Sequence, residues 1–228
     1  MTIKVAIDGP AGAGKSTIAK NVARQLGIPY VDTGAIYRSL TWVAMQANVS
    51  IDDENELSHL AEELDILFIP EGLSQKVIVQ GSDITHVIRE PEISAKVSLV
   101  AKFPQVRKAL LSIQTNLSES PLGVVMDGRD IGTSIIPSAE VKIYLTASLE
   151  VRAKRRFDEM SRQGFQVELE KVQWELKARD FADQNREASP LRMAQDAVVL
   201  DTSLLTIEEA SAMVAALCEV RQRNKGVQ

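Results

Sequence analysis

The sequence predicts an α/β fold in which helices flank a central parallel β-sheet. Short apolar runs that end in a polar residue are typical of buried parallel strands, and they occur at residues 3–8, 124–127, 141–146 and 198–201. Segments with helical periodicity separate these runs, so strands and helices alternate along the chain. In such folds ligands gather at the carboxyl ends of the strands, where Asp8, Asp32, Asp127 and Asp201 lie.

The first strand-like run leads directly into residues 9–17, which read GPAGAGKST. Glycines at both ends of the four-residue gap allow the tight turn that points backbone N–H groups at one anion. Lys15 supplies a positive charge for phosphates, Ser16 can ligate Mg²⁺, and the following helix adds its positive dipole end. We therefore predict a nucleoside triphosphate site made of Gly9, Pro10, Ala11, Gly12, Ala13, Gly14, Lys15, Ser16 and Thr17. A flexible Gly/Ala turn is the alternative, which the flanking strand and helix disfavour.

Two helices have clear boundary signals. An apolar stripe predicts a helix over residues 16–26, with Gly27 in the position of a C-terminal cap and Pro29 preventing continuation. Near the end of the chain, Thr206 and Glu209 have the spacing of a capping box and precede an amphipathic helix.

Between residues 64 and 93 the pattern changes from α/β alternation to short strand-like pieces. These pieces lie at residues 66–69, 77–79 and 84–85, and turns at Gly72 and Gly81 join them. We interpret the segment as a small antiparallel lobe that is inserted after a helix containing Ile36 and Leu40. We expect this lobe to hold a ligand over the strand ends.

The composition is typical of one globular domain spanning residues 1–228. Charged residues make up 25% and hydrophobic residues 45%, without the run of about 18 apolar residues that a membrane span needs. The net charge of −5 argues against a nucleic-acid partner. A strand begins almost at the N-terminus, which disfavours a secretory signal and predicts a cytoplasmic location. The single cysteine, Cys218, lies among apolar residues and is expected to be buried.

Asp127 ends an apolar strand and is followed by Gly128, Arg129 and Asp130. A carboxylate in this position can hold Mg²⁺, directly or through water, while Ser16 holds it from the other side. Arg129 would lie close enough to neutralise phosphate charge. The plainer interpretation is a strand-terminal aspartate that caps the next turn, and the two interpretations are compatible.

Further basic residues fall into three groups. Thr33 is a candidate N-cap for a helix that carries Arg38, which either faces a second anion or is solvated. A basic cluster at Arg152, Lys154, Arg155, Arg156 and Arg162 is either a solvated helix face or a set of mobile arginines that close over a triphosphate.

The third group is Arg179, Asp183 and Arg186, whose spacing of four and three residues places them on one face of a helix. An ordinary ladder of salt bridges would use the same spacing. Because arginine forks suit phosphate and a carboxylate suits ribose hydroxyls, a clamp for an acceptor nucleotide is the sharper hypothesis.

Taken together, these motifs resemble the bacterial cytidylate (CMP) kinases, within the P-loop nucleoside monophosphate kinases. The similarity covers nearly the whole chain. The strings that carry it are GPAGAGKST, DTGAIYR from Asp32, IREPEIS from Ile88, FPQVRKAL from Phe103, DGRDIGT from Asp127 and RDFADQNREASPL from Arg179. The first string is shared by many P-loop proteins, whereas DGRDIGT and the Arg179 segment are selective and make shikimate and adenylate kinases poor fits.

The resemblance implies an ATP-binding core with Mg²⁺, a monophosphate-binding subdomain at residues 37–105, and a lid with its following clamp helix at residues 154–186. It also implies that Lys15, Arg129, Arg155 and Arg156 are catalytic. Under the same resemblance the CMP-binding residues would be Ser98, Arg107 and Asp130 at the base, Arg38, Arg129 and Arg179 at the phosphate, Asp183 and Arg186 near the ribose, and Thr33 along the nucleotide.

The implied reaction is transfer of the γ-phosphoryl group of ATP to CMP, and to dCMP, by a protein expected to be a monomer. Cytosine presents an N4 amino group, and the Asp130 carboxylate can accept a hydrogen bond from it. Uracil would instead place a carbonyl oxygen against that carboxylate. The acceptor phosphate is already anionic, so neither His59 nor His86 needs a catalytic role. The alternative from a different class is a P-loop ATPase or nucleotide switch with no small-molecule acceptor. A switch needs a water-positioning residue and an effector surface, and no sequence signal for either is found.

Overall fold

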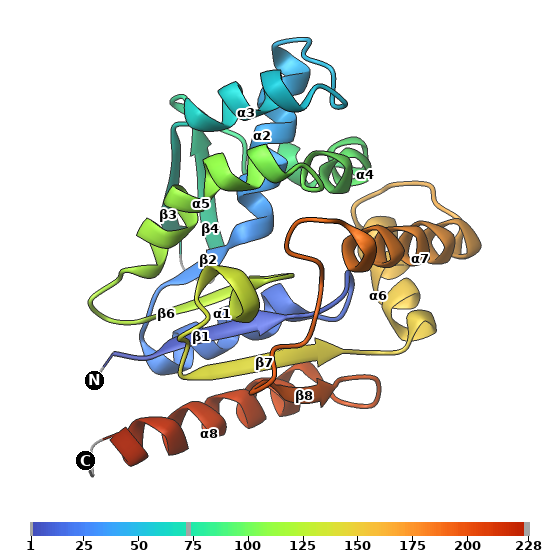
Figure 1. Cartoon of the computed structure of the whole chain (residues 1–228). Coiled ribbons are helices and arrows are strands. Elements are labelled where there is room, and N and C mark those ends of the chain that lie inside the picture. Colours follow the sequence, from blue (N-terminus) through green and yellow to red (C-terminus); the bar gives the residue numbers. More distant parts are fainter. Residues whose placement is uncertain (1, 72–73, 226–228) are drawn as a thin grey trace.

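A computed structural model describes residues 2–71 and 74–225 and shows a parallel sheet flanked by helices (Figure 1). The sheet order is β2-β6-β1-β7-β8, and every neighbouring pair is parallel. Its strands are β1 Lys4–Asp8, β2 Tyr30–Asp32, β6 Val124–Gly128, β7 Val141–Thr146 and β8 Val198–Asp201. The predicted α/β fold with its central parallel sheet is confirmed.

Helices α1 (Lys15–Leu26) and α8 (Ile207–Lys225) cover one face of this sheet. Their apolar stripes bury Val22 and Val214 against strand residues such as Ile143. The other face packs against η2, a π-helical turn over Ile131–Ile135 that follows β6. The core lies between these layers, which leaves the carboxyl ends of the strands free of packing helices.

The predicted helix boundaries are confirmed. Gly27 has φ 66° and donates its N–H to the carbonyls of Ala23 and Arg24 at the end of α1. At the start of α8, Thr206 N donates to Glu209 Oε2 at 2.9 Å, and Glu209 N donates to Thr206 Oγ1 at 3.1 Å. Cys218 is fully buried inside α8, as expected.

The outer strand β8 corrects one expectation. We predicted it to be buried like the others, yet Val198 and Val199 are 44% and 53% exposed. The reason is its position, because β8 pairs only with β7 and forms an edge of the sheet. Only Leu200 of this strand points into the core.

The segment between β2 and β6 forms a lobe beside the sheet (Figure 1). Its elements are α2 Thr33–Gln46, α3 Glu54–Glu62, β3 Ile66–Glu71, β4 Ser74–Val79, β5 Ser82–Asp83, η1 Val87–Arg89, α4 Pro91–Val100 and α5 Pro104–Ser118. Strands β3, β4 and β5 are antiparallel, which confirms the predicted small sheet. The third strand lies at residues 82–83 and not at 84–85, because the hydroxyl of Thr85 accepts the Val77 N–H in place of a ladder carbonyl. Gly81 has φ 79° in its turn, and Gly72 lies outside the described residues.

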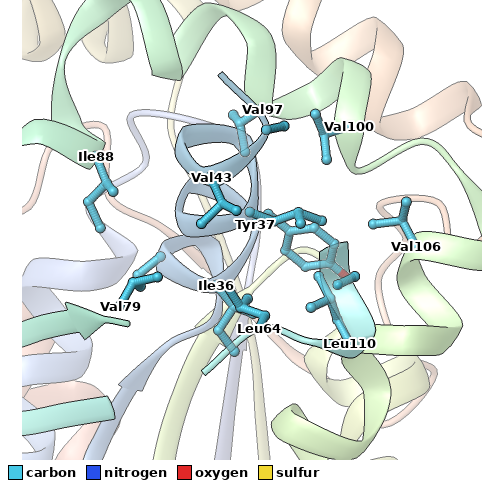
Figure 2. Packing of buried hydrophobic residues seen from close by; sticks show 14 of the residues in the cluster. Ile36, Tyr37, Val43, Leu64, Val79, Ile88, Val97, Val100, Val106 and Leu110 are labelled. Atoms are coloured by element: carbon cyan, nitrogen blue, oxygen red, sulfur yellow. The ribbon is translucent and has the colours of Figure 1, made fainter. Parts of the chain in front are cut away.

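This lobe has its own hydrophobic core around α2 (Figure 2). Ile36 and Leu40 of α2 are fully buried, and they pack among Ile88, Leu110 and other side chains from η1, α4, α5 and the small sheet. Because helix α5 leads directly into β6, the lobe is joined to the sheet at two places. Arg38 of α2 and Arg107 of α5 therefore reach the carboxyl ends of the sheet strands from this lobe.

Helices α6 (Leu149–Arg162) and α7 (Leu169–Asn185) pack on each other beside the strand ends (Figure 1). Ala153 and Met160 of α6 contact Val172 and Leu176 of α7, and Ala11 joins the same cluster. This helix pair is thus packed directly against the loop of residues 9–14. No helix in the described ranges is long and apolar enough to cross a membrane.

Candidate active site

One cleft of about 740 Å³ lies at the carboxyl ends of the strands, between the lobe and the α6–α7 pair. It brings together most of the residues that the sequence singled out. Those that line it are Ala11, Gly12, Ala13, Gly14, Lys15, Ser16, Thr17, Thr33, Arg38, Ser98, Arg107, Asp127, Arg129, Asp130, Arg155, Arg156, Arg179, Asp183 and Arg186. Gly9 and Pro10, which begin the glycine-rich loop, are buried and do not line the cleft.

The loop of residues 9–14 requires glycine for two physical reasons. A Cβ on Gly9 would lie 1.9 Å from the carbonyl oxygen of Leu145, so no side chain fits there. Gly12 and Gly14 have φ of 76° and 91°, a conformation that side chains disfavour. Lys15 follows at the start of α1, is only 6% exposed, and donates Nζ to the carbonyl of Pro10 at 2.8 Å.

Ser16 and Asp127 meet across the cleft floor. Ser16 Oγ donates to Asp127 Oδ2 at 2.9 Å, and Tyr30 Oη donates to Asp127 Oδ1 at 2.7 Å. Burial and the nearby Asp32 carboxylate raise the pKa of Asp127. A positive ion would relieve this cost, and hydroxyl and carboxylate oxygens are ligands that Mg²⁺ prefers. The two side chains that we predicted to flank a metal therefore fit one.

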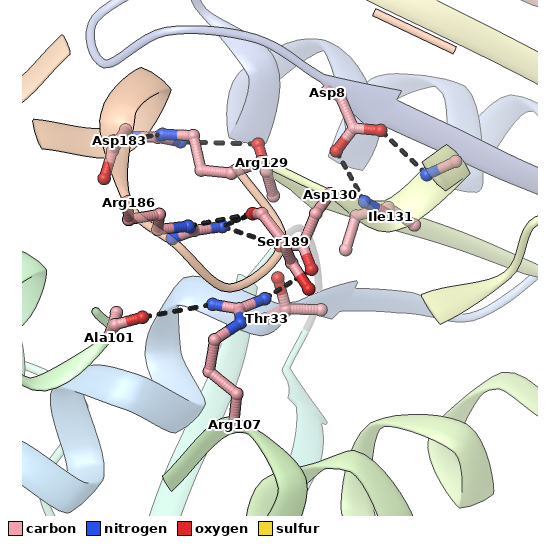
Figure 3. Close-up of polar contacts among 12 residues, drawn as sticks. Asp8, Thr33, Ala101, Arg107, Arg129, Asp130, Ile131, Asp183, Arg186 and Ser189 are labelled. Carbon is pink, nitrogen blue, oxygen red and sulfur yellow. Dashed lines mark hydrogen bonds and ion pairs between the residues drawn. The ribbon is translucent and has the colours of Figure 1, made fainter. Parts of the chain in front are cut away.

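A buried ion-pair network occupies the other end of the cleft (Figure 3). Asp130 accepts from Arg107 Nη2 through Oδ2, and from Arg186 Nη2 through Oδ1 at 3.2 Å. The Arg107 guanidinium also lies 5.3 Å from the centre of the Tyr37 ring. The three charged side chains are only 7%, 7% and 5% exposed for Arg107, Asp130 and Arg186. Such a rigid arrangement can present both hydrogen-bond acceptors and donors to a flat polar molecule.

Between the two ends lie Arg129 and Asp183, joined by a hydrogen bond of 2.8 Å from Nε to Oδ2 (Figure 3). Burial acts to raise the pKa of Asp183, but Arg129 and Arg179 outweigh it, so this pKa is lowered. The alternative of a ladder within α7 is wrong. Asp183 pairs with Arg129, while Arg186, which lies one residue beyond α7, pairs with Asp130.

Lys15 and Arg179 carry positive charge that the described side chains leave unmatched. In the described part of the chain, the buried Nε of Arg179 has no hydrogen-bond partner. Burial, with Arg129 close by, lowers the pKa of Arg179 to about 10 and moves the pKa of Lys15 well below its ordinary value. An anion placed between these groups would reverse both effects, because it would stabilise the charged forms.

At the start of α2, Asp32 organises two arginines. Its carboxylate accepts from Arg38 Nη2 at 2.8 Å and from Arg89 Nη2 of the lobe at 3.2 Å, and it caps the helix by accepting from Ala35 N at 3.0 Å. The predicted N-cap, Thr33, is wrong, since Asp32 has that role. The Thr33 hydroxyl instead donates to the Asp127 carbonyl at 2.8 Å.

Arg152 corrects the interpretation of the basic cluster as mobile arginines. Its guanidinium is buried, and Nη1 donates to the carbonyl of Ala11 at 3.0 Å and to Asp180 Oδ2 at 2.6 Å. These bonds connect α6 to the phosphate-binding loop and to α7. Arg152 is therefore a structural support of the loop, for which its position in a basic string offered no signal.

The other basic residues of α6 have different surroundings. Arg155 donates to the carbonyl of Thr202 at 2.7 Å, and Arg156 pairs with Glu159 at 2.8 Å, both on the cleft wall. Arg162 also lines the cleft, whereas Lys154 pairs with Asp158 on the exposed side. The solvated-face interpretation thus holds for Lys154, and Arg162 is exposed as well although it borders the cleft.

Residues 5–220 match the sequence model of the family described as Cytidylate kinase. The chain belongs to the cytidylate kinase family. It is 47% identical to the cytidylate kinase of Ligilactobacillus salivarius strain UCC118 over 219 residues, which are 96% of this chain and 97% of that protein. It is 48% identical to the cytidylate kinase of Bacillus subtilis strain 168 over 221 residues, which are 97% and 98% of the two chains.

Solved structures support the fold of this cytidylate kinase family member. A gluconokinase from Sinorhizobium meliloti 1021 superposes with a TM-score of 0.52 at 14% identity, covering 99% of this chain and 97% of that one. At such low identity the similarity concerns the fold alone.

Sequence reasoning missed several residues in and around this site. Tyr30 and Arg89 contact carboxylates of the cleft, yet nothing in the sequence pairs them with Asp127 and Asp32. The motif around Ile88 contained Arg89, so its position in a selective string was the one available signal. The two histidines, His59 and His86, are exposed on the lobe and do not line the cleft.

Proposed function

We propose that this member of the cytidylate kinase family transfers the γ-phosphoryl group of ATP to CMP, and also to dCMP, giving ADP and CDP or dCDP. The observation that carries the proposal is that one cleft has two ends of different chemistry. The loop of residues 9–17 suits a triphosphate, and the buried network of Arg107, Asp130 and Arg186 suits a base that both donates and accepts hydrogen bonds.

The network explains a preference for cytosine. A carboxylate has about four lone-pair positions, and Arg107 and Arg186 occupy only part of this capacity at Asp130. The N4 amino group of cytosine can donate to the remainder, while the arginines donate to the acceptors of the ring. Uracil would set its O4 acceptor against the carboxylate, at a cost of about 1–3 kcal/mol for the unpaired buried groups. Ser98, on the same wall, would contact the base as well.

Charge at the middle of the cleft explains how two anions are brought together. Burial first, and then the nearby Arg129, lower the pKa of both Lys15 and Arg179, so a bound anion would stabilise their charged forms. The acceptor phosphate would bind between Arg38, Arg129 and Arg179, next to the γ-phosphate. Because this nucleophile is already ionised, catalysis consists of alignment and charge neutralisation by Lys15, Arg129, Arg155 and Arg156.

Ser16 and Asp127 would hold Mg²⁺, directly or through water, together with ATP. When bound, the ion neutralises charge on the β- and γ-phosphates. Tyr30 keeps the Asp127 carboxylate oriented toward the loop through its 2.7 Å hydrogen bond.

Exclusion of water is the remaining requirement for a kinase. We propose that the lobe of residues 37–105 closes over the monophosphate and that residues 154–186 act as the lid with its clamp helix. Asp183, Arg186 and Thr33 would then line the sugar and the nucleotide between the two ends. We further propose that the protein acts as a cytoplasmic monomer.

The proposal is tested by mixing the purified protein with ATP, Mg²⁺ and each nucleoside monophosphate in turn. ADP should form rapidly with CMP and dCMP, more slowly with UMP, and least with purine monophosphates. ADP production that is independent of any added monophosphate would favour the alternative, an ATPase or nucleotide switch.

A further inference from the structure

The turn that follows β6 has an unusual arrangement of carboxylates. Asp130 immediately precedes the π-helical turn of Ile131–Ile135 and occupies its N-cap position, with φ −142° and ψ 26°. Aspartate is among the side chains that most favour capping the free N–H groups at such a position. Yet Asp130 makes no capping hydrogen bond, because its carboxylate faces Arg107 and Arg186.

Asp8, at the end of β1, caps this turn in its place (Figure 3). The backbone N–H of Ile131 donates to Asp8 Oδ1 at 2.8 Å, and that of Gly132 donates to Asp8 Oδ2 at 2.8 Å. The two residues are 123 and 124 positions away from Asp8 in the sequence. Asp8 is only 5% exposed and does not line the cleft, so it contacts neither substrate.

We propose that Asp8 is a positioning residue for selection of the acceptor nucleotide. By accepting hydrogen bonds from the amides of Ile131 and Gly132, it leaves the Asp130 carboxylate free to face the base. This inference rests on the proposed function, because it concerns how the same cleft selects cytosine.

The amides of the turn and the arginines of the base pocket compete for the Asp130 carboxylate. Two buried N–H groups at the start of the turn must have an acceptor, because an unpaired buried amide is costly. If Asp8 could not accept from both, Asp130 would be placed to accept in its stead, because it occupies the N-cap position. Capping its own turn would draw Asp130 away from Arg107 and Arg186 and out of the base pocket.

The arrangement is also closed on its outer side. A Cβ on Gly132 would lie 3.4 Å from Asp8 Oδ2 and 3.1 Å from Cδ of Lys142, so little room remains for another group to reach the amides. Asp130, at the N-cap position of the turn, is therefore the side chain placed to take over from Asp8.

The decisive variant is Asp8→Asn, which keeps the shape but replaces one acceptor oxygen by an N–H₂ donor. One of the two amides then faces a donor and loses its partner. We expect the ratio of kcat/KM for CMP to that for UMP to fall at least about tenfold, as when one hydrogen bond to a charged group is lost. The loss should appear mainly in the KM for CMP, with the KM for ATP changed less than about twofold on this argument.

A double-mutant cycle separates positioning from a general structural effect. Asp8→Asn, Asp130→Ala and the double variant are compared for the CMP to UMP ratio. If Asp8 acts through Asp130, adding Asp8→Asn to Asp130→Ala should not lower the ratio further. Additive losses, or an unchanged ratio in Asp8→Asn alone, would overturn the inference.

Val214→Ala serves as the matched control, because it removes packing under α8 without approaching the cleft. If Val214→Ala had the same Tm as Asp8→Asn and lost the CMP preference to the same extent, the inference would also be overturned. If Asp8→Asn does not accumulate as folded protein, Asp8→Ser provides the same test with a small hydroxyl acceptor. A wild-type enzyme that does not prefer CMP would refute the proposed function, and this inference with it; a wild-type preference that survives in Asp8→Asn would refute the inference alone.

Discussion

Replacing Asp130 by alanine should remove much of the distinction between CMP and UMP. The carboxylate lies between Arg107 and Arg186, and all three side chains are 7% exposed or less. Water can therefore replace it only poorly. The cytosine N4 group would lose a charge-assisted hydrogen bond worth about 1.5–3 kcal/mol, which corresponds to about 10- to 150-fold in kcat/KM. Uracil gains in relative terms, because its O4 no longer meets a carboxylate.

The same substitution should destabilise the fold. Two buried guanidinium groups would lose their shared carboxylate, and breaking a buried pair from one side costs about 3–5 kcal/mol. Stability must therefore be measured by denaturant unfolding beside the kinetics, at a temperature where the variant is folded.

The assay compares kcat/KM for CMP and for UMP at saturating ATP in the wild type and in Asp130→Ala. Asp130→Asn is a useful companion, because it preserves the shape and replaces one acceptor by a donor that can meet uracil O4. A folded Asp130→Ala variant with the wild-type ratio would refute base recognition by this carboxylate. A defect confined to the KM for ATP would refute it as well.

The remaining predictions concern the middle of the cleft and the turn after β6. Lys15→Ala should suppress turnover with every acceptor by at least about 100-fold, since one preorganised charge at a transferring phosphoryl group is worth about 3 kcal/mol; initial rates measure this, and a variant defective with CMP alone would contradict it. Arg179→Ala should mainly raise the KM for the acceptor, and a defect limited to ATP would instead place Arg179 in the lid. For Asp8, burial, reinforced by Asp130 and opposed by the two amides and by Lys15, raises the pKa from 3.8 to about 6. Between these pH values the folded chain keeps a proton that the unfolded chain has lost, so the contribution of Asp8 to stability is largest below pH 3.8 and falls as the pH rises through about 6. The stability difference between wild type and Asp8→Asn should therefore fall by about 3 kcal/mol across this window, measured by urea unfolding at closely spaced pH. A difference that does not vary with pH would contradict this assignment.

The parts of the fold that were predictable are those encoded by neighbouring residues. The loop of residues 9–17 carries its own strand, glycines and helix start, so its form follows from local sterics and backbone hydrogen bonds. The ends of α1 and α8 were predictable for the same reason, through Gly27 and the Thr206–Glu209 pair.

The place of each strand within the sheet was harder to predict from the sequence. The segments of β7 and β8 have similar apolar runs, but β8 has a strand neighbour on one side only, which exposes Val198 and Val199. A local pattern does not contain strand order. Likewise, Asp32 and Thr33 are both suitable caps, and the choice depends on Arg38 and Arg89 drawing the aspartate to the start of α2.

Ion pairs across long sequence distances were the least predictable part of the site. Arg152 reaches Asp180, 28 positions away, and Arg129 reaches Asp183, 54 positions away. In each case the sequence identified one or both residues as charged and important, but not as partners. Pairing is decided by the packing of α6, α7 and the turn after β6, which is a property of the whole fold.

These pairings explain how a chain with a net charge of −5 builds a site for two polyanions. Carboxylates from other parts of the fold already hold Arg38, Arg107, Arg129 and Arg186 in place, so these arginines are oriented but largely neutralised. Within the described chain, Lys15 donates only to a backbone carbonyl, and neither Lys15 nor Arg179 forms an ion pair, in contrast to those four arginines. The uncompensated charge is thus concentrated where the γ-phosphate and the acceptor phosphate would meet. Neutralising Lys15 should therefore weaken phosphoryl transfer more than neutralising any single paired arginine, whereas neutralising Arg179 should mainly weaken binding of the acceptor.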